Sequence, residues 1–206
     1  MPNDARSLLH LSIVEVWQVE LEQDEPRVQR LRTLLSADER ARAERLRRGR
    51  ERWIVARAAL RLLLAERLGC APDTVEFGVG EHGKPFLDGG PLRFNLSHSG
   101  TLAVVALAEA VEVGVDVERP GRNVAAVERS LSAGERASGD DLLQLWCRKE
   151  AWAKATGGGL GWAPEAFDTT AVRGYALADL ALEHGYVGAL AVAGADAAHT
   201  LRRFAF

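Results

Sequence analysis

The chain contains the run Val111-Glu112-Val113-Gly114-Val115-Asp116-Val117-Glu118, in which valines alternate with acidic residues and one glycine. Alternate side chains of a β-strand share a face, so the valines line one face, and Glu112, Asp116 and Glu118 line the other. The run can therefore be an amphipathic strand with one face in water. Gly114 lies on the acidic face, where its missing side chain leaves room for a ligand or for another backbone.

The segments before this run predict a strand, a long helix and further strands. A partly alternating segment at 11–21 predicts the first strand. Ser36 and Glu39 form a capping box, which indicates the start of a long helix. That helix is expected to be interrupted near Gly49 and to end at Leu68-Gly69, because glycine commonly terminates helices.

The segments after the run predict the same order again. A second long helix is expected at 140–156, stopped by the glycines that begin at Gly157. A hairpin at Glu109-Ala110 is expected to join the strand at 102–108 to the strand at 111–117. The other expected elements are short helices at 27–35 and 123–131 and strands at 75–79, 92–95, 167–172, 186–192 and 200–206.

This order of elements predicts an α+β fold with two similar lobes. Residues 1–109 are expected to form an N-terminal lobe and residues 110–206 a C-terminal lobe, in a pseudo-two-fold arrangement. Each lobe would be a small antiparallel sheet packed on a long helix, with a cleft between the lobes. The division rests on element order alone, because no sequence identity between the halves is visible.

The composition is that of a globular protein with a sizeable core. Of 206 residues, 47% are hydrophobic and 27% are charged, and the net charge of -3 gives no indication of nucleic-acid binding. Cys70 and Cys147 are too few and too far apart for a disulfide framework, which fits a reducing cytoplasm. No signal peptide and no run of about 18 apolar residues is seen, so no membrane span is expected.

Arginine supplies most of the positive charge. Thirteen arginines lie between Arg27 and Arg67, where acids are few. One interpretation is a solvated, arginine-rich helix face. The other is that a few of these arginines bind an anionic ligand, because guanidinium matches the geometry of phosphate.

The predicted second long helix carries a candidate catalytic pair. Glu150 and Lys154 are four residues apart and share a helix face, which could be an ordinary surface ion pair. Trp146 lies on the same face, and a charged pair beside a tryptophan is less exposed to water. If Glu150 meets Asp116 and Glu118, the three carboxylates require a cation. Oxygen ligands of this kind suit Mg²⁺, with Mn²⁺ as an alternative.

Two further segments could bind phosphate, although each has a plain structural alternative. Phe94-Asn95-Leu96-Ser97-His98-Ser99-Gly100 surrounds a histidine with hydroxyl and amide donors. A single histidine in a turn more often has a structural role. Lys84 lies in the turn Gly83-Lys84-Pro85, where a lysine is usually just exposed.

Together these four segments resemble the 4'-phosphopantetheinyl transferase superfamily, in its larger two-lobed type, which activates peptide and polyketide synthases (the surfactin-synthetase-activating type). The resemblance spans residues 36–172, and the four motifs come in the order and at the spacing of the family. It implies a Mg²⁺-dependent transfer of the phosphopantetheine arm of coenzyme A to a serine of an apo acyl or peptidyl carrier protein. Adenosine 3',5'-bisphosphate is the other product.

The resemblance also implies roles for individual residues. Asp116, Glu118 and Glu150 would organise the metal on the pyrophosphate, Lys154 would contact the phosphates, and Glu150 would accept the serine proton. The catalytic set is therefore Glu150, Lys154 and Asp116. The residues implied to bind coenzyme A are Arg42, Arg57, Lys84, Pro85, Ser97, His98 and Lys154.

One departure from the family pattern concerns carrier recognition. Leu131-Ser132-Ala133-Gly134-Glu135 keeps the glutamate of the family but has Leu131 where an aromatic residue is common. The carrier is expected to dock near this segment, so the departure leaves the choice of carrier open. A monomer is expected, because the cleft would lie within one chain.

Two other functions would explain part of the pattern. A metal-dependent phosphodiesterase or nuclease could use the same three carboxylates, but it would not account for Gly83-Lys84-Pro85 or for Ser97-His98. An inactive module that binds coenzyme A or a carrier protein would not require all the catalytic positions to hold competent residues. Neither nucleic acid nor a membrane is expected as a partner.

Overall fold

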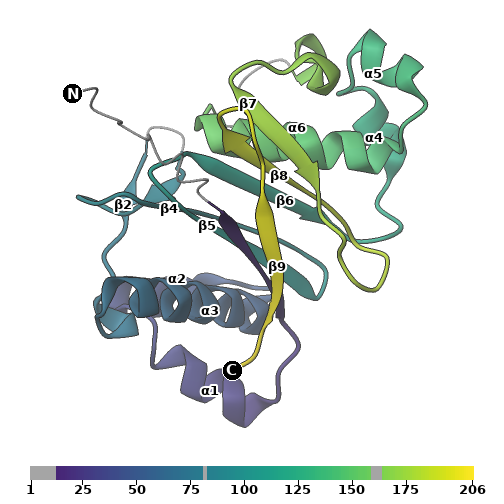
Figure 1. Ribbon diagram of the computed structural model, residues 1–206. Coiled ribbons are helices and arrows are strands. Elements are labelled where there is room, and N and C mark those ends of the chain that lie inside the picture. Colours follow the sequence, from purple (N-terminus) through teal and green to yellow (C-terminus); the bar gives the residue numbers. More distant parts are fainter. Residues whose placement is uncertain (1–12, 81–82, 159–163) are drawn as a thin grey trace, which may run out of the picture.

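The computed structural model describes residues 13–80, 83–158 and 164–206 and has a mixed α+β fold (Figure 1). Two β-sheets lie between two long helices, α3 (Arg50–Leu68) and α6 (Leu142–Thr156). Helix α3 packs on the outer face of one sheet, and α6 packs on the outer face of the other. The α+β class predicted from the sequence is confirmed.

The first sheet has the strand order β4-β5-β1-β9, and its last strand comes from the other end of the chain. Strands β4 (Leu92–Ser99), β5 (Leu102–Glu109) and β1 (Val14–Glu20) pair antiparallel. Strand β9 (His199–Phe204) pairs parallel with β1. The C-terminal strand therefore completes the sheet that the N-terminal half begins.

The second sheet is antiparallel, with the order β6-β8-β7. It consists of β6 (Val113–Glu118), β8 (Val187–Ala193) and β7 (Tyr175–Asp179). A separate small hairpin is formed by β2 (Gly78–Val79) and β3 (Pro85–Phe86).

Shorter helices complete the chain. In the N-terminal half these are α1 (Glu25–Arg32), α2 (Ala37–Arg45) and the 3₁₀ turn η1 (Pro72–Thr74). In the C-terminal half they are α4 (Val124–Glu128), α5 (Ala133–Ser138) and the 3₁₀ turns η3 (Pro164–Ala166) and η4 (Thr169–Ala171).

The apolar core lies in three layers. The valines of β6 pack with Val14, Val16 and Val104 between the two sheets. A larger cluster fills the space between α3 and the first sheet. Small residues form the layer between α6 and the second sheet, including Cys147 and Ala151. Burying one valine or leucine completely contributes about 1.5 to 3 kcal/mol, so these layers supply most of the stabilisation.

The predicted helix boundaries are confirmed where capping residues define them. Ser36 and Glu39 exchange the two hydrogen bonds of a capping box at the start of α2. Gly49, with φ of 67°, separates α2 from α3, and Gly69, with φ of 65°, ends α3. Gly157 ends α6 in the same left-handed conformation, with φ of 72°.

The predicted hairpin at Glu109-Ala110 is wrong. Strands β5 and β6 belong to different sheets, and the chain passes between them through Ala110, which has a positive φ of 61°. The predicted strand at 167–172 is also wrong, because that segment contains η4 and the strand begins later, at Tyr175. Of the expected strand at 75–79, only Gly78–Val79 is extended and paired. The beginning of the strand expected at 11–21 lies outside the described residues.

The acidic face of β6 is not the face in water. Both faces of this strand are buried, because α6 covers the side that carries Gly114 and Asp116. A Cβ on Gly114 would overlap the carbonyl of Ala151 and the amide nitrogen of Ala155. The glycine therefore admits the backbone of α6, and the idea that it leaves space for a ligand is wrong.

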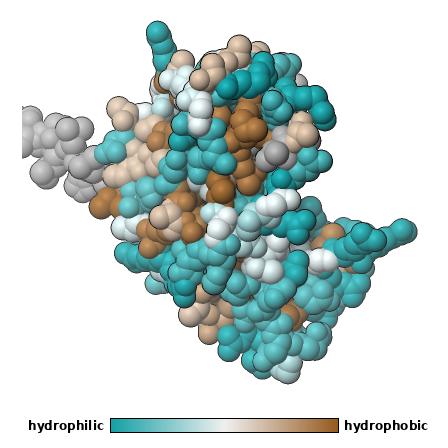
Figure 2. Space-filling model, turned by 90° about the vertical axis from the view of Figure 1, so that its right-hand side faces the viewer, coloured by the Kyte–Doolittle hydropathy of each residue, from teal (hydrophilic) through white to brown (hydrophobic). Residues whose placement is uncertain are grey.

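The surface is mostly hydrophilic, with apolar residues gathered towards the middle of the face seen in Figure 2. The large hydrophobic side chains that are exposed in the described ranges are Ile13, Leu68, Val79 and Phe86. None of the helices in these ranges is long and apolar enough to cross a membrane.

Candidate active site

Three of the predicted site residues meet where β4, β6 and α6 come together. Lys154 Nζ lies 2.6 Å from Asp116 Oδ1 and donates to Ser97 Oγ at 2.9 Å and to the carbonyl of Val115 at 3.2 Å. Ser97 Oγ donates to the same Asp116 oxygen at 2.8 Å. The close approach of α6 at Gly114 makes these contacts possible, because it brings Lys154 down onto the strand.

The second carboxylate oxygen of Asp116 has no such partner. Asp116 is 5% exposed, and its Oδ2 atom is buried without a hydrogen-bond partner in the described part of the chain. A buried acceptor left unpaired costs about 1 to 3 kcal/mol. Cys147 lies beside this carboxylate, and burial, together with the charge of Asp116, raises the pKa of its thiol. An incoming cation would satisfy the unpaired oxygen.

Glu150 lies one helical turn before Lys154 on α6. Partial burial raises the pKa of Glu150, the charge of Asp116 raises it further, and Lys154 and Arg122 offset part of the effect. Among the described residues, no hydrogen bond or ion pair engages the Glu150 carboxylate. A carboxylate with a raised pKa is better suited to accept a proton near neutral pH.

Glu118, the third predicted carboxylate, is already engaged. It accepts a hydrogen bond from Ser99 Oγ at 2.9 Å and forms an ion pair with Arg122. The guanidinium of Arg122 also lies over the ring of Trp146, 5.1 Å from its centroid. Glu118 is therefore held at the end of β6, two residues beyond Asp116.

The three carboxylates are not drawn together around one point. Within the described ranges, no group of three acidic, histidine or cysteine side chains is arranged to hold a metal ion. Lys154 and Arg122 instead supply the positive charge next to Asp116 and Glu118. The carboxylate oxygens nevertheless suit a divalent cation as ligands, because Asp116 Oδ2 has no hydrogen-bond partner and the Glu150 carboxylate is not engaged among the described residues. The metal set of Asp116, Glu118 and Glu150 stays a prediction.

His98 follows Ser97 on β4 and therefore points to the opposite face of that strand. Desolvation lowers the pKa of the His98 imidazole, and the charge of Lys154 lowers it further. The sequence placed this residue after a strand, whereas β4 continues through Ser99.

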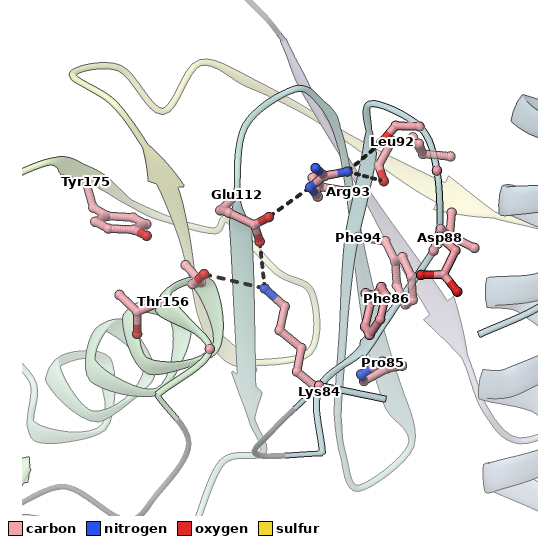
Figure 3. Close-up of a pocket in the computed structure, with 16 residues that line it drawn as sticks. Lys84, Pro85, Phe86, Asp88, Leu92, Arg93, Phe94, Glu112, Thr156 and Tyr175 are labelled. Atoms are coloured by element: carbon pink, nitrogen blue, oxygen red, sulfur yellow. Dashed lines mark hydrogen bonds and ion pairs between the residues drawn. The ribbon is translucent and has the colours of Figure 1, made fainter. Parts of the chain in front are cut away.

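Lys84 and Pro85 line a cavity of about 620 Å³ next to β3 (Figure 3). Lys84 Nζ donates to Glu112 Oε2 at 3.1 Å, to the carbonyl of Val113 at 3.3 Å and to the carbonyl of Ala155 at 3.5 Å. It therefore ties β6 to the C-terminal end of α6, where backbone carbonyls favour a cation. Figure 3 shows the side chain reaching across the cavity wall to Glu112.

Glu112 lies just before β6 and has a different role from Asp116 and Glu118. It pairs with Lys84 and accepts a hydrogen bond from Arg93 Nε at 2.8 Å. These two cations neutralise it at the start of the strand, whereas Asp116 meets Lys154 farther along.

The two arginines predicted to bind coenzyme A are engaged in the N-terminal half. Arg57 Nε donates to Glu39 Oε1 at 2.8 Å, and its guanidinium lies 4.6 Å from the centroid of Phe77. Burial lowers the pKa of Arg57, and Glu39 offsets part of that effect. Arg42 lies over Trp53, 5.6 Å from its centroid. Across the described ranges, neither arginine has a hydrogen bond or ion pair to the Asp116 cluster.

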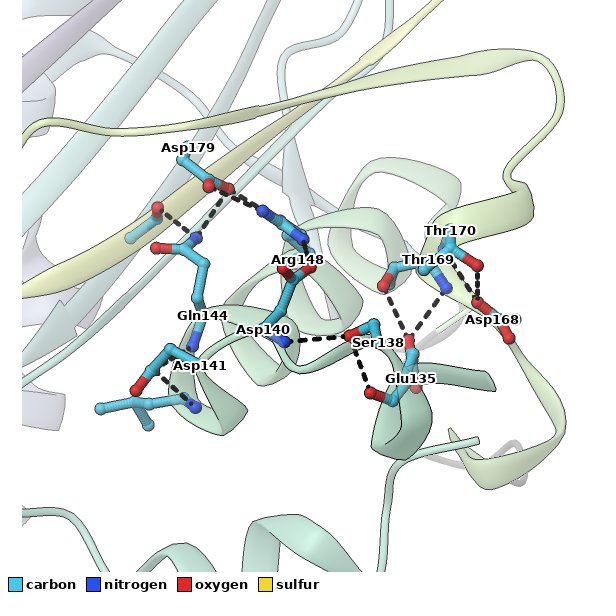
Figure 4. A network of polar contacts seen from close by, with 12 residues as sticks. Glu135, Ser138, Asp140, Asp141, Gln144, Arg148, Asp168, Thr169, Thr170 and Asp179 are labelled. Atoms are coloured by element: carbon cyan, nitrogen blue, oxygen red, sulfur yellow. Dashed lines mark hydrogen bonds and ion pairs between the residues drawn. The ribbon is translucent and has the colours of Figure 1, made fainter. Parts of the chain in front are cut away.

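A second polar network lies on another side of α6 (Figure 4). Glu135 accepts hydrogen bonds from the amide and hydroxyl of Thr169, at 2.9 and 2.7 Å, and from the amide of Ser132 at 2.8 Å. Lys149 Nζ lies 2.8 Å from Glu135 Oε2 and donates to the carbonyl of Pro164 at 2.7 Å. This network joins α5 and the segment around η4 to α6.

Sequence reasoning missed several residues of the site. Asn95 and Ser99 contact β6 from β4, and Arg122 pairs with Glu118. A signal for the first two was present, because both are spaced by two from Ser97 and so share its face of the strand. Nothing in the sequence indicates the partner of Arg122.

Residues 112–185 match the family model of the 4'-phosphopantetheinyl transferase superfamily. The 4'-phosphopantetheinyl transferase HetI of Nostoc is 34% identical over 166 residues, which cover 71% of this chain and 70% of HetI. The chain belongs to the 4'-phosphopantetheinyl transferase superfamily.

Other members of the superfamily match over shorter shares of their length. The Synechocystis protein slr0495, a candidate 4'-phosphopantetheinyl transferase, is 34% identical over 154 residues, or 66% of this chain and 63% of that protein. The Escherichia coli 4'-phosphopantetheinyl transferase AcpT is 37% identical over 134 residues, or 59% of this chain and 65% of AcpT. The chain thus aligns with less than two thirds of the length of these two relatives.

Proposed function

We propose that the protein transfers the 4'-phosphopantetheine arm of coenzyme A to a serine of an apo acyl or peptidyl carrier protein, releasing adenosine 3',5'-bisphosphate. The observation that carries this proposal is the cluster of Asp116, Lys154 and Ser97, with Glu150 unengaged beside it. Membership of the superfamily supports it, because HetI and AcpT are 4'-phosphopantetheinyl transferases.

The acidic residues are proposed to hold the metal. Asp116 would offer its unpaired oxygen, and Glu118 and Glu150 would complete the set around Mg²⁺, with Mn²⁺ as a substitute. When bound, the ion stabilises negative charge on the pyrophosphate oxygens. Ser97 and Lys154 keep the first oxygen of Asp116 fixed, so that the second oxygen stays directed away from them.

Lys154 and Glu150 are proposed to act on the reacting groups. Lys154 is 28% exposed at its side chain, so its ammonium can turn from Asp116 to a phosphate. It would neutralise charge on the phosphate that is attacked. Glu150 would accept the proton of the carrier serine, and its raised pKa suits that role.

Coenzyme A is proposed to lie along β4 and the turn before β3. Ser97 and His98 would bind it from opposite faces of the edge strand β4, and Lys84 and Pro85 would bind beside the cavity that they line. Arg42 and Arg57 are also proposed to bind coenzyme A, and Glu39 already engages Arg57. A bound nucleotide would have to compete with that ion pair.

The division into lobes at 109/110, which β9 crosses to join the first sheet, is proposed as the frame of this site. In support, each sheet carries one long helix on its outer face, and the Asp116 cluster draws on β4 from one half and on β6 and α6 from the other. Because all these residues belong to one chain, we propose a monomer. The unpaired thiols of Cys70 and Cys147 support a cytoplasmic location.

The direct test is mass spectrometry of apo carrier proteins incubated with the protein, coenzyme A and Mg²⁺. Transfer predicts that the carrier gains one phosphopantetheine group, and a panel of acyl and peptidyl carriers would identify the preferred class. Cleavage of coenzyme A without a carrier adduct would instead support a metal-dependent phosphodiesterase. Binding of coenzyme A without either reaction would support an inactive binding module.

Glu150→Gln tests the mechanism separately. Removing a general base costs about 10²- to 10⁴-fold in rate, so we expect transfer to fall at least 100-fold. A matched control is Glu66→Gln on α3, which makes the same change at an exposed glutamate outside the Asp116 cluster. An unchanged rate in Glu150→Gln would mean that Glu150 is neither the base nor a needed ligand.

A further inference from the structure

Strands β4 and β6 lie side by side at the edges of two different sheets. Strand β4 ends the first sheet and β6 ends the second, and in the described chain no backbone hydrogen bond joins them. Side chains of β4 take the place of that missing ladder. Asn95 Oδ1 accepts a hydrogen bond from the amide of Val115 at 2.9 Å, and Ser99 Oγ accepts one from the amide of Arg119 at 3.1 Å.

These contacts follow a strict spacing. Asn95, Ser97 and Ser99 are two residues apart, so all three share one face of β4. Their partners advance along β6 in the same direction, from the amide of Val115 to the carboxylates of Asp116 and Glu118. One face of β4 therefore acts as a polar template for β6.

The template fixes the two carboxylates of β6 differently. Asn95 is 6% exposed and holds the backbone immediately before Asp116. Ser99 uses both functions of its hydroxyl: it donates to Glu118 Oε2 at 2.9 Å and accepts from the amide of Arg119. A slip of β6 by one residue would turn its side chains to the opposite face. The ladder with β8 sets the register of β6 within its own sheet, and the contacts of Asn95 and Ser99 fix that register against β4.

We propose that Asn95 and Ser99 are positioning residues, which hold β6 in register on β4 so that Asp116 and Glu118 can bind a divalent cation together. The inference rests on the proposed function, in which these carboxylates are metal ligands. Neither residue needs to touch substrate. Residues that orient metal ligands in this way typically contribute about 10- to 100-fold in metal affinity or activity.

Ser99 offers the sharper test, because threonine and valine have nearly the same shape and differ in the hydroxyl. We expect Ser99→Val to bind Mn²⁺ about 10-fold more weakly than the wild type in the presence of coenzyme A, and Ser99→Thr to retain most of the affinity. Free Mn²⁺ is measured directly by electron paramagnetic resonance, without any turnover. Thr74→Val removes a hydroxyl from the exposed η1 turn and should leave Mn²⁺ binding unchanged.

The same variants separate positioning from substrate binding in the transfer assay. Ser99→Val should lower kcat about 10-fold while the KM for coenzyme A changes about twofold or less, and a higher Mg²⁺ concentration should recover part of the rate. Asn95→Leu, which removes the acceptor of the Val115 amide at similar volume, should act in the same direction. If Asn95→Leu does not fold, the Ser99 pair still decides the matter.

The outcomes distinguish failure of this inference from failure of the proposed function. Wild-type affinity for Mn²⁺ in Ser99→Val would overturn the positioning role while leaving the metal site intact. A wild-type protein that binds no Mn²⁺ with coenzyme A would overturn the proposed metal site, and the positioning role with it. If Ser99→Thr loses as much Mn²⁺ affinity as Ser99→Val, the shape of Ser99 and not its hydroxyl determines binding. That result would overturn the role assigned to the hydroxyl.

Discussion

Helix α6 carries two lysines that have opposite surroundings. Lys149 is 1% exposed at its side chain and pairs with Glu135, which is 0% exposed and accepts three further hydrogen bonds. Lys154 is 28% exposed, and it pairs with Asp116, whose second oxygen has no partner in the described residues. The first pair is complete, whereas the second leaves one position open.

Glu135 and Glu150, the glutamates beside these two lysines, have pKa values that are shifted in opposite directions. Burial alone would raise the pKa of Glu135, but hydrogen bonds from Lys149, Thr169 and Ser132 outweigh it and lower that pKa. Burial and the charge of Asp116 raise the pKa of Glu150. A fully satisfied network stabilises one structure, and a partly satisfied one is costly until a ligand completes it. The comparison thus separates a structural face of α6 from the face that we propose to be functional.

Breaking the Lys149 pair should give the largest effect on stability. Lys149→Met leaves the Glu135 charge buried without its cation, and removing one partner of a buried pair costs about 3 to 5 kcal/mol. We expect that loss in the free energy of unfolding, measured by urea denaturation. Any loss of transfer should follow from unfolding, since Lys149 faces away from Asp116.

The double variant Lys149→Met with Glu135→Gln is the matched control. Glutamine removes the unpaired charge and retains one acceptor oxygen, which can serve the amide of Thr169 or that of Ser132, whereas Glu135 accepts from the two amides through different oxygens. The double variant should therefore lose less stability than the sum of the two single variants. Purely additive losses would show that the two side chains do not stabilise each other. That result would contradict a structural role for the Lys149–Glu135 pair.

A smaller effect is expected from Gly114→Ala, which acts on the face of α6 that we propose to be functional. The added Cβ would overlap the backbone of α6 at Ala151 and Ala155, and overpacking of this kind costs about 1 to 3 kcal/mol. Because α6 must move away from β6, Lys154 should separate from Asp116. The transfer rate should therefore fall by more than the loss of folded protein accounts for. Urea denaturation and the carrier mass assay measure the two effects.

Gly90→Ala controls for the loss of glycine itself. A Cβ at Gly90 would meet no atom within 4 Å, and its φ is not in the left-handed region. We expect a change within about 0.5 kcal/mol in the free energy of unfolding. A Gly114→Ala protein as stable as Gly90→Ala would contradict the close contact between α6 and β6.

Helix ends and helix faces depend on residues that are neighbours in the chain, and local signals in the sequence predicted them. The capping box at Ser36, the break at Gly49 and the stop at Gly157 were all readable, because a helix end is determined by a few adjacent side chains. Glu150 and Lys154 were placed on one helix face for the same reason: their spacing determines it.

The contacts between distant segments could not be predicted in this way. An alternating strand looks the same whether its polar face meets water or a helix, so Asp116 was expected on a wet face and is buried under α6. Glu112 shares the spacing of Asp116, yet Lys84 and Arg93 neutralise it. Nor does periodicity state which sheet a strand joins, which is why β5 and β6 were expected to form a hairpin.

The smallest expected effect is a difference in acid sensitivity between the two faces of α6, measured without metal in EDTA. The lowered pKa of Glu135 means that the unfolded chain binds its proton first as pH falls. Glu135 therefore contributes stability above its ordinary pKa of 4.5, and this contribution is lost as pH falls through the folded value. The raised pKa of Glu150 has the opposite effect, because its ionised form lowers stability as pH rises above 4.5.

Against the wild type, Glu135→Gln should make the free energy of unfolding rise less steeply with pH between about 3 and 6, and Glu150→Gln should make it rise more steeply. Urea denaturation at several pH values measures both slopes, and equal slopes in the two variants would contradict the contrast between a completed and an open cluster.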